Sequence, residues 1–284
     1  MGWNWFRRKK YENLKRNRKV KLGVAFGGGG ARGIAFVGVI RAFEELQIVP
    51  DYIAGTSVGA IAGALYAGGK DSSFLEGAVK NIRMKDIRNS KFIWKPSYAK
   101  NIENLLLKLF DGDVMFSELN IPFASVCTNI KTGEEVDIMS GSVAKAVSGS
   151  CAIPGVFTPV EFDDMHLVDG MLKNNVPADV VRRMGANIVI AIDLHENRAA
   201  GTISTKMFPL LSSSLGVLLQ TNVDAKKKYA DIVLTPDLSE FKSTKIGDID
   251  KMIEVGYNAV MAAKDEIIKI LSRRPKKIKY EQKL

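Results

Sequence analysis

A serine set between two glycines is the first feature of this sequence that could do chemistry. The stretch Gly55-Thr56-Ser57-Val58-Gly59 follows a short apolar segment and leads into a run of small residues. A strand that turns sharply into a helix needs glycines on both sides of the serine, because larger side chains would clash with the two elements. Such a turn lifts the hydroxyl above the sheet edge, so the pattern predicts a nucleophile at Ser57. The alternative is a Gly/Ser turn that only connects a strand to a helix.

A glycine-rich stretch, Gly27 to Gly33, precedes this serine in the chain. It contains the spacing Gly28-x-Gly30-x-x-Gly33, which is typical of dinucleotide-binding loops. Those loops also need an Asp or Glu about 20 residues later, at the end of the second strand. Here Asp51 precedes that strand instead. We therefore expect no dinucleotide site, and no Walker phosphate loop either, because no Gly-Lys-Ser/Thr follows the glycines.

The glycine-rich stretch can serve the serine instead. Both stretches follow strands, and the carboxyl ends of parallel strands meet at one edge of a sheet. Backbone N–H groups of the glycine stretch would then stabilise the oxyanion that forms when Ser57 attacks an ester carbonyl. Three interpretations are open for Arg32 within this stretch. It orients the loop, it binds a lipid phosphate, or it is a surface residue at the start of a helix.

A serine hydroxyl needs a base, and the sequence offers few candidates. The two histidines are His166 and His195. The order Ser57…Asp169…His195 would imitate the triad of an ordinary α/β hydrolase. However, Ser57 comes after only one or two strands, which is too early for the α/β-hydrolase fold. Asp169 ends a predicted strand and precedes Gly170, so it could accept the Ser57 proton directly. The alternative for Asp169 is a turn-forming residue.

Short apolar strands alternate with helical patterns along the chain. We predict strands at residues 21–26, 52–54, 121–129, 135–139, 166–168, 186–192 and 232–234. We predict helices at residues 31–46, 60–67, 205–228 and 249–272, with another starting at 143–147. Residues 71–115 have the pattern of a helical insertion, which forms either a lid or part of the core. Since several strands are apolar on both faces, we predict one α/β domain with a mostly parallel sheet between helices.

The net charge of +10 is concentrated at the two ends of the chain. Residues 1–21 carry +8 and residues 269–284 carry +6, so residues 22–268 carry −4. Trp3, Trp5 and Phe6 precede the first basic cluster, and aromatic rings beside basic residues suit an anionic membrane surface. A solvated, disordered tail is the alternative. Nucleic acid is disfavoured as a partner, because no nucleic-acid-binding motif accompanies the charge.

We therefore divide the chain into a basic aromatic N-terminal tail (1–20), an α/β domain (21–272) and a basic C-terminal tail (273–284). The composition, 46% hydrophobic and 25% charged, is that of an ordinary globular protein. Cys127 and Cys151 make no disulfide framework and no metal spacing, and two histidines are too few for a His-rich metal site. We expect no metal and no other cofactor. The first residues lack the apolar stretch of a secretory signal, and no segment is apolar over a bilayer-spanning length. We expect a cytoplasmic protein that associates peripherally with the inner face of the membrane if the tails bind lipid.

Four stretches together resemble the bacterial patatin-like phospholipases. They are GGGGARG (27–33), GTSVG (55–59), SCAIPGVFTPV (150–160) and LVDGMLKNNVP (167–177), followed by MGANIVIAIDL (184–194). Each stretch is a weak signal alone. Together they are specific, because they follow one another in the family's order between residues 21 and about 240.

The resemblance implies a three-layer α/β fold and a Ser–Asp dyad without histidine. It places the nucleophile at Ser57, the base at Asp169, and the oxyanion hole at Gly28, Gly29 and Gly30 with Arg32 alongside. It also implies a lipid substrate: acyl esters of phospholipids, lysophospholipids or similar lipids, hydrolysed through an acyl-enzyme without a metal.

One residue departs from the family's pattern. In the family, the Asp-Gly pair is usually followed by a second glycine or another small residue, whereas Met171 follows Asp169 and Gly170 here. The turn after Asp169 could therefore have a different shape. The sequence predicts a serine acyl hydrolase of lipid esters. The alternative is a catalytically weak lipid-binding or regulatory protein with the same fold.

Overall fold

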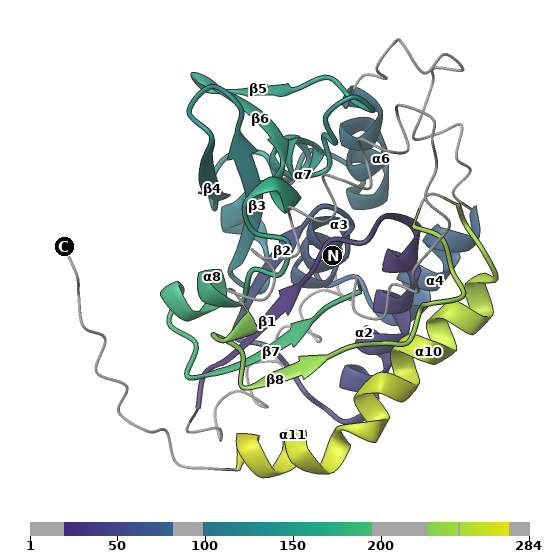
Figure 1. Ribbon diagram of the computed structural model, residues 1–284. Helices are drawn as coiled ribbons and strands as arrows, with labels where there is room; N and C mark the ends of the chain where they lie inside the picture. The colour runs from purple at the N-terminus through teal and green to yellow at the C-terminus, as the bar shows by residue number, and fades with distance from the viewer. Residues whose placement is uncertain (1–19, 82–98, 195–226, 244, 273–284) are drawn as a thin grey trace, which may run out of the picture.

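Eight strands form one sheet in the computed structural model, which describes residues 20–81, 99–194, 227–243 and 245–272 (Figure 1). The strands are β1 (Leu22–Phe26), β2 (Tyr52–Thr56), β3 (Phe123–Asn129), β4 (Glu134–Ile138), β5 (Val160–Phe162), β6 (Met165–Asp169), β7 (Ile188–Ile192) and β8 (Ile232–Leu234). Their order is β5-β6-β3-β2-β1-β7-β8, and β4 also pairs with β3.

The sheet has a parallel core and an antiparallel margin. β3, β2, β1, β7 and β8 run parallel to their neighbours in the core. β4 and β6 pair antiparallel with β3, and β5 pairs antiparallel with β6. This arrangement confirms the predicted α/β fold with a mostly parallel sheet. The predicted strands are all present, and β5 is a strand that the sequence pattern did not predict.

The helices differ from the predicted ones mainly at their ends. They are α2 (Ala35–Glu45), α3 (Val58–Ala67), α4 (Ser72–Asn81), α6 (Lys100–Phe110), α7 (Val143–Ser150), α8 (Ala178–Arg183), α10 (Ile249–Ala262) and α11 (Lys264–Leu271). Within the described ranges, three short 3-10 turns are η1 (Gly30–Ile34), η2 (Phe116–Glu118) and η3 (Gly170–Leu172). The predicted helix at 31–46 thus begins as a 3-10 turn, and the closing helix at 249–272 is two helices. The short helix α8 was not predicted, and most of the predicted helix at 205–228 lies outside the described residues.

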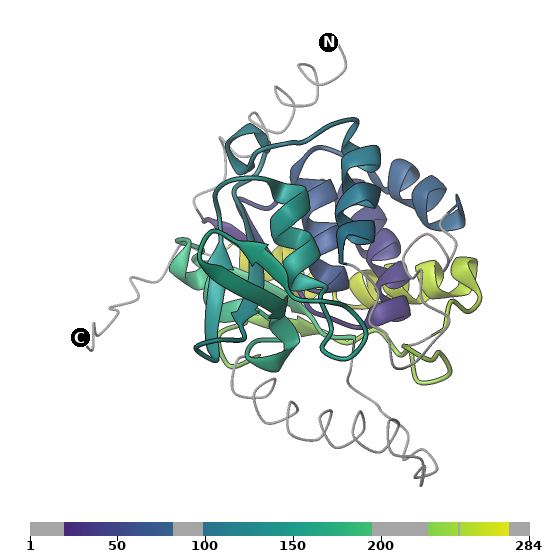
Figure 2. The same cartoon turned by 90° about the horizontal axis from the view of Figure 1, so that it is seen from above.

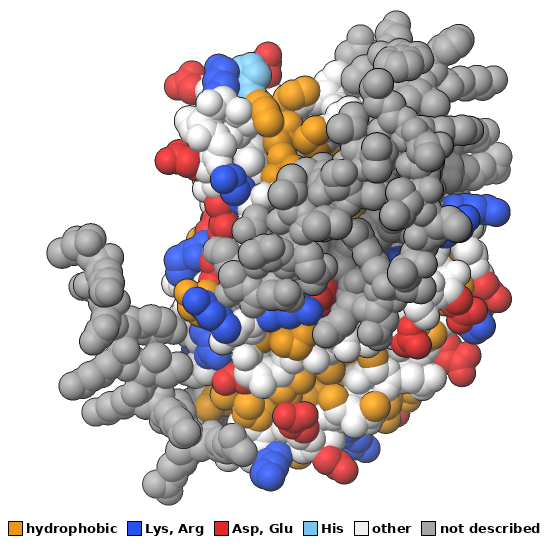
Figure 3. Space-filling model, in the orientation of Figure 1, with side chains coloured by type: hydrophobic (Ala, Val, Ile, Leu, Met, Phe, Trp, Pro, Cys, Tyr) orange, Lys and Arg blue, Asp and Glu red, His pale blue; other side chains and the backbone are white. Residues whose placement is uncertain are grey.

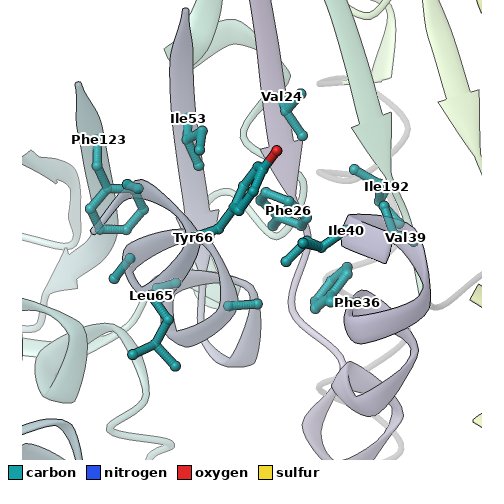
Figure 4. Close-up of a cluster of buried hydrophobic side chains, with 14 of the residues drawn as sticks. Val24, Phe26, Phe36, Val39, Ile40, Ile53, Leu65, Tyr66, Phe123 and Ile192 are labelled. Atoms are coloured by element: carbon teal, nitrogen blue, oxygen red, sulfur yellow. The ribbon is translucent and has the colours of Figure 1, made fainter. Parts of the chain in front are cut away.

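Side chains of the core strands alternate between two buried faces. In β1, Val24 and Phe26 join the larger hydrophobic cluster, while Ala25 between them joins the smaller one. Helices α2, α3, α4 and α10 pack on the face of the sheet that carries the larger cluster (Figure 1 and Figure 2). Figure 4 shows Phe36 and Ile40 of α2 beside Phe26. Helix α8 packs on the opposite face against β1, β2 and β7, so the fold has three layers.

The described helices of the 71–115 insertion pack against the body of the domain. Helix α4 contacts α2, and α6 contacts α7. Leu75, Ile102 and Leu106 are buried in the larger cluster. Residues 82–98 lie outside the described residues, as do the tails apart from Val20, which is buried. Within the described ranges, every helix is too short or too polar to cross a bilayer.

Candidate active site

The turn after β2 holds Ser57 in a strained conformation. Its φ of 55° and ψ of −128° are rare for a residue with a side chain. The flanking glycines are required by space. A Cβ at Gly55 would lie 2.4 Å from the carbonyl oxygen of Gly59, and a Cβ at Gly59 would lie 2.2 Å from that of Phe26. The turn therefore has the geometry that the glycine spacing predicted for a nucleophile.

The register along β3 explains how Asp169 reaches this turn. β2 pairs in parallel with β3 as far as Thr56, which lies opposite Val126. β6 pairs antiparallel with the following residues of β3, and Asp169 lies opposite Cys127. Because β4 occupies the other edge of β3 over residues 125–129, β2 and β6 share one edge. Their carboxyl ends therefore meet head to head.

Ser57 and Asp169 are in direct contact. The Ser57 hydroxyl donates to Asp169 Oδ2 at 2.7 Å. Asp169 is fully buried, and this burial raises its pKa to about 7, although the N–H of Met171 and the hydroxyl of Ser57 act to lower it. A carboxyl with a pKa near neutrality can accept and return a proton at neutral pH. The fold thus brings together the two residues that the sequence suggested as nucleophile and base.

The backbone after Asp169 accommodates methionine at position 171. A Cβ at Gly170 would lie 2.2 Å from the carbonyl oxygen of Val126, so this position needs glycine. Met171 is not among the described residues with positive φ, so its backbone does not need glycine. Its N–H donates to Asp169 Oδ1 at 2.9 Å. This contact comes from the main chain, and a methionine supplies it as well as a small residue would.

Ser150, at the end of α7, is a site residue that the sequence analysis missed. The backbone N–H of Ser57 donates to Ser150 Oγ at 2.9 Å, and the Ser150 hydroxyl donates to the carbonyl oxygen of Val126 at 2.5 Å. Its only sequence signal was its place in the stretch at 150–160. The neighbouring Cys151 is buried, and burial raises the pKa of its thiol well above the usual range, which makes it a poor nucleophile.

The glycine loop, residues 27–30, lies directly beside the serine. A Cβ at Gly28 would lie 3.4 Å from Ser57 Cβ. The N–H of Gly28 already donates to the carbonyl oxygen of Asn175 at 3.0 Å, which argues against the expected oxyanion role of this amide. Among the described residues, no hydrogen bond engages the N–H of Gly29 or of Gly30. These two amides can serve as oxyanion donors.

Arg32 is buried and bonded to main-chain carbonyls. Its Nε donates to the Phe241 oxygen at 2.8 Å, and its Nη1 donates to the Leu194 oxygen at 3.2 Å. The segment at 241–243 also supplies Ser243, whose carbonyl oxygen accepts from the N–H of Ala31 at 2.8 Å. Of the three interpretations of Arg32, the geometry favours the one in which it orients the glycine loop.

The other candidate residues lie elsewhere. Among the described residues, no histidine is hydrogen-bonded to Ser57 or Asp169; His166 lies on β6 opposite Glu161, and His195 is outside the described ranges. Asp51 accepts from the N–H of Leu22 at 2.8 Å, near the amino ends of β1 and β2 and away from the glycine loop. The part of the chain that the structure describes holds no cluster of three potential metal ligands.

The sequence of residues 24–182 matches the model of a family described as patatin-like phospholipase. A mouse patatin-like phospholipase domain-containing protein 7 is 28% identical over 271 residues, covering 83% of this chain and 20% of the mouse protein. An uncharacterized NTE family protein of Mycobacterium tuberculosis is 31% identical over 268 residues, covering 85% of this chain and 46% of its own length. The chain thus spans less than half of these curated relatives.

Two solved structures share the fold at low sequence identity. VipD from Legionella pneumophila superimposes with a TM-score of 0.61 and 14% identity, covering 87% of this chain and 67% of VipD. Human GIVD cytosolic phospholipase A2 gives a TM-score of 0.50 and 12% identity, covering 93% of this chain and 62% of the human chain. At these identities the two likenesses bear on the fold alone.

Proposed function

This chain belongs to the patatin-like phospholipase family, and on that premise we propose that it is a serine acyl hydrolase of lipid carboxylic esters. The substrates we propose are phospholipids or lysophospholipids. The observation that supports this most is the 2.7 Å contact from the Ser57 hydroxyl to buried Asp169, made at a strained strand-to-helix turn. Family membership supports the substrate class that we propose, and this contact supports the proposed roles of Ser57 as nucleophile and Asp169 as base.

In the proposed acylation step, Asp169 Oδ2 takes the proton of Ser57 as Oγ attacks the ester carbonyl carbon. The N–H groups of Gly29 and Gly30 stabilise the negative charge on the carbonyl oxygen. When the tetrahedral intermediate collapses, the bond to the alcohol breaks and Asp169 returns the proton to the departing oxygen. The products are the free alcohol, such as a lysophospholipid, and an acyl group esterified to Ser57.

In the proposed deacylation step, water replaces the alcohol. Asp169 takes a proton from the water as the water oxygen attacks the acyl carbon, and the N–H groups of the same two glycines stabilise the oxyanion. Collapse breaks the bond to Ser57 Oγ, which regains a proton from Asp169. A free fatty acid leaves, Ser57 carries its proton again, and Asp169 is again a carboxylate.

A catalytically weak lipid-binding or regulatory protein is the alternative function. The sequence observation behind it was Met171, the departure after Asp169 and Gly170. That observation loses weight because the main chain of Met171 holds Asp169 Oδ1 at 2.9 Å. We therefore keep this alternative only as an outcome of the experiment below.

We also propose that the protein acts at an anionic membrane surface, on the inner face of the cell membrane. The proposal is supported by the +8 of residues 1–21 and the +6 of residues 269–284, together with Trp3, Trp5 and Phe6. Each basic residue near such a surface adds about 1 kcal/mol of attraction. A surface-bound enzyme would meet its lipid substrate without crossing the bilayer.

Release of p-nitrophenol from short and long acyl esters tests the proposed hydrolysis. We expect turnover by the wild type and its loss in Ser57→Ala and in Asp169→Asn, with both variants still folded by circular dichroism. A lipid fluorophosphonate, the class of inhibitor bound to the human phospholipase A2, should label the wild type and not Ser57→Ala. A folded wild type that neither turns over ester nor takes the label would favour the lipid-binding alternative.

A further inference from the structure

The main chain of Asn174 and Asn175 connects three parts of the candidate site: the serine turn, the glycine loop and the turn after Asp169. The hydroxyl of Thr56, next to Ser57, donates to the carbonyl oxygen of Asn174 at 2.7 Å. The N–H of Gly28 donates to the carbonyl oxygen of Asn175 at 3.0 Å. The Asn174 N–H in turn donates to the oxygen of Gly170 at 2.8 Å, which closes the turn after the base. A displacement of the dipeptide 174–175 would therefore move nucleophile, glycine loop and base relative to one another.

The side chain of Asn174 anchors this dipeptide to charged residues. Asn174 is fully buried, and its Nδ2 donates to Asp179 Oδ1 at 2.8 Å and to Glu135 Oε1 at 3.1 Å. These two carboxylates come from α8 and β4, respectively. Buried amide donors that lose such acceptors are costly, so the anchor holds as long as the two carboxylates stay in place.

Arg183, at the end of α8, holds the carboxylates in place. It donates to Asp179 Oδ2 at 2.8 Å, to Glu135 Oε1 at 3.1 Å and to Asp137 Oδ2 at 2.6 Å. The Arg183 side chain is 53% exposed, so this cluster runs from the surface to buried Asn174. Without the guanidinium, three carboxylates would face one another, and their repulsion would spread the acceptors of Asn174.

We propose that Arg183 is a positioning residue for hydrolysis, acting through Asn174 on the alignment of Ser57, Asp169 and the glycine loop. This inference rests on the proposed function. Misplacement of reacting groups by about 1 Å can cost on the order of a hundredfold in rate. Arg183 is half exposed and acts through Asn174 instead of touching the reacting groups. We therefore expect a smaller loss, roughly tenfold in kcat.

Paired arginine variants test the proposal. Arg182 precedes Arg183 on the same helix, but it bonds to Asp231 and to the carbonyl oxygens of Tyr229 and Asn187. We expect Arg183→Gln to lower kcat for a p-nitrophenyl ester roughly tenfold with KM within about twofold. We expect Arg182→Gln to leave kcat within about twofold of the wild type. Arg183→Lys, which keeps the charge without the planar fork, should recover part of the loss.

The results separate this proposal from the proposed function. Wild-type turnover that depends on Ser57, with an unchanged kcat in Arg183→Gln, would overturn the positioning role alone. Equal losses in both arginine variants, matched by equal falls in melting temperature, would also overturn it. Wild type without any Ser57-dependent turnover would overturn the proposed function and this inference with it. As a second variant, Asn174→Asp keeps the shape but sets a third carboxylate against Asp179 and Glu135, and we expect its kcat to fall further than that of Arg183→Gln.

Discussion

At the scale of single residues, the proposed mechanism depends on the ionisation of Asp169. Only the carboxylate can take the Ser57 proton, and burial raises the pKa of Asp169 to about 7. Two hydrogen bonds, from the Met171 N–H and the Ser57 hydroxyl, partly offset this burial. The side chain is therefore a base of moderate strength, in balance between its two forms near neutral pH.

We predict that kcat/KM for an uncharged ester rises with pH through about 7 and then levels off, because the carboxylate fraction of Asp169 rises over that range. A pH–rate profile with p-nitrophenyl butyrate, corrected for spontaneous hydrolysis, measures it. The Ser57→Ala variant gives the blank. A profile that is flat through neutrality would assign the base role to another group.

The same pKa predicts how stability depends on pH. The unfolded carboxyl has a pKa near 3.8 and the folded one near 7, so between these values the folded protein holds a proton that the unfolded chain has lost. The free energy of unfolding therefore falls as pH rises through this window, by up to a few kcal/mol. Asp169→Asn has no carboxyl to ionise, so its free energy of unfolding lacks this decrease.

We expect the melting temperature of Asp169→Asn to exceed that of the wild type at about pH 8 and the difference to shrink as pH falls towards about 4. Differential scanning fluorimetry across this range, with Ser57→Ala as the control that keeps the carboxyl, measures the difference. A difference that stays constant with pH would contradict the raised pKa.

At the scale of elements, local sequence predicted the strands and the serine turn but not how two strands meet. Gly55 and Gly59 indicated the turn because their spacing around Ser57 is a local pattern, although the crowding at Gly59 comes from Phe26 of β1. The contact with Asp169 depends on β6 pairing antiparallel with β3 beyond the end of β2, and no local pattern encodes that register. Ser150 was missed for the same reason, since its role arises only where α7 packs beside the turn.

Short elements were missed for a different reason. α8 has six residues, too few for a helix periodicity to emerge. β5 has three residues with Glu161 in the middle, so it lacks the unbroken apolar run by which the equally short β8 was predicted. The closing helix was predicted as one because no glycine or proline marks its break at Ala263. The engaged N–H of Gly28 likewise depends on a distant partner, Asn175, and could not be read from the glycine spacing.

Substitutions at two neighbouring residues beside the junction of β6 with β3 should have different effects on stability and turnover. We expect Gly170→Ala to lower both the melting temperature and kcat, because the added Cβ would lie 2.2 Å from a main-chain oxygen of β3. We expect Met171→Gly to keep kcat within about twofold, because its contribution is a main-chain N–H. The two variants are compared by ester turnover and by thermal melting. A large gain in Met171→Gly would show that methionine distorts the turn after all.

At the scale of the whole molecule, charge is distributed unevenly along the chain. Figure 3, in the orientation of Figure 1, shows basic and acidic side chains interspersed over the described part of the visible surface. Residues 22–268 carry −4, while both ends are strongly basic. We therefore assign the proposed electrostatic attraction to a membrane to the two ends, and attraction of this kind weakens with salt.

We predict that deleting residues 1–19, which keeps buried Val20, weakens binding to anionic vesicles more at low salt than at high salt. Co-sedimentation with phosphatidylglycerol vesicles measures it, and phosphatidylcholine vesicles are the uncharged control. Turnover of a water-soluble ester should not change, since the deletion leaves the candidate site intact. Equal vesicle binding with and without these residues would remove the N-terminal tail from the membrane proposal.

Hydrolysis by the proposed mechanism requires that Ser57 form an acyl-enzyme with Asp169 as its base. Intact-mass spectrometry after an acid quench during turnover of a p-nitrophenyl ester tests it most directly. We predict a mass increase of one acyl group, located by peptide mapping on Ser57, in the wild type and its absence in Ser57→Ala. Turnover without any adduct on Ser57, or an adduct on another residue that survives Ser57→Ala, would contradict the mechanism.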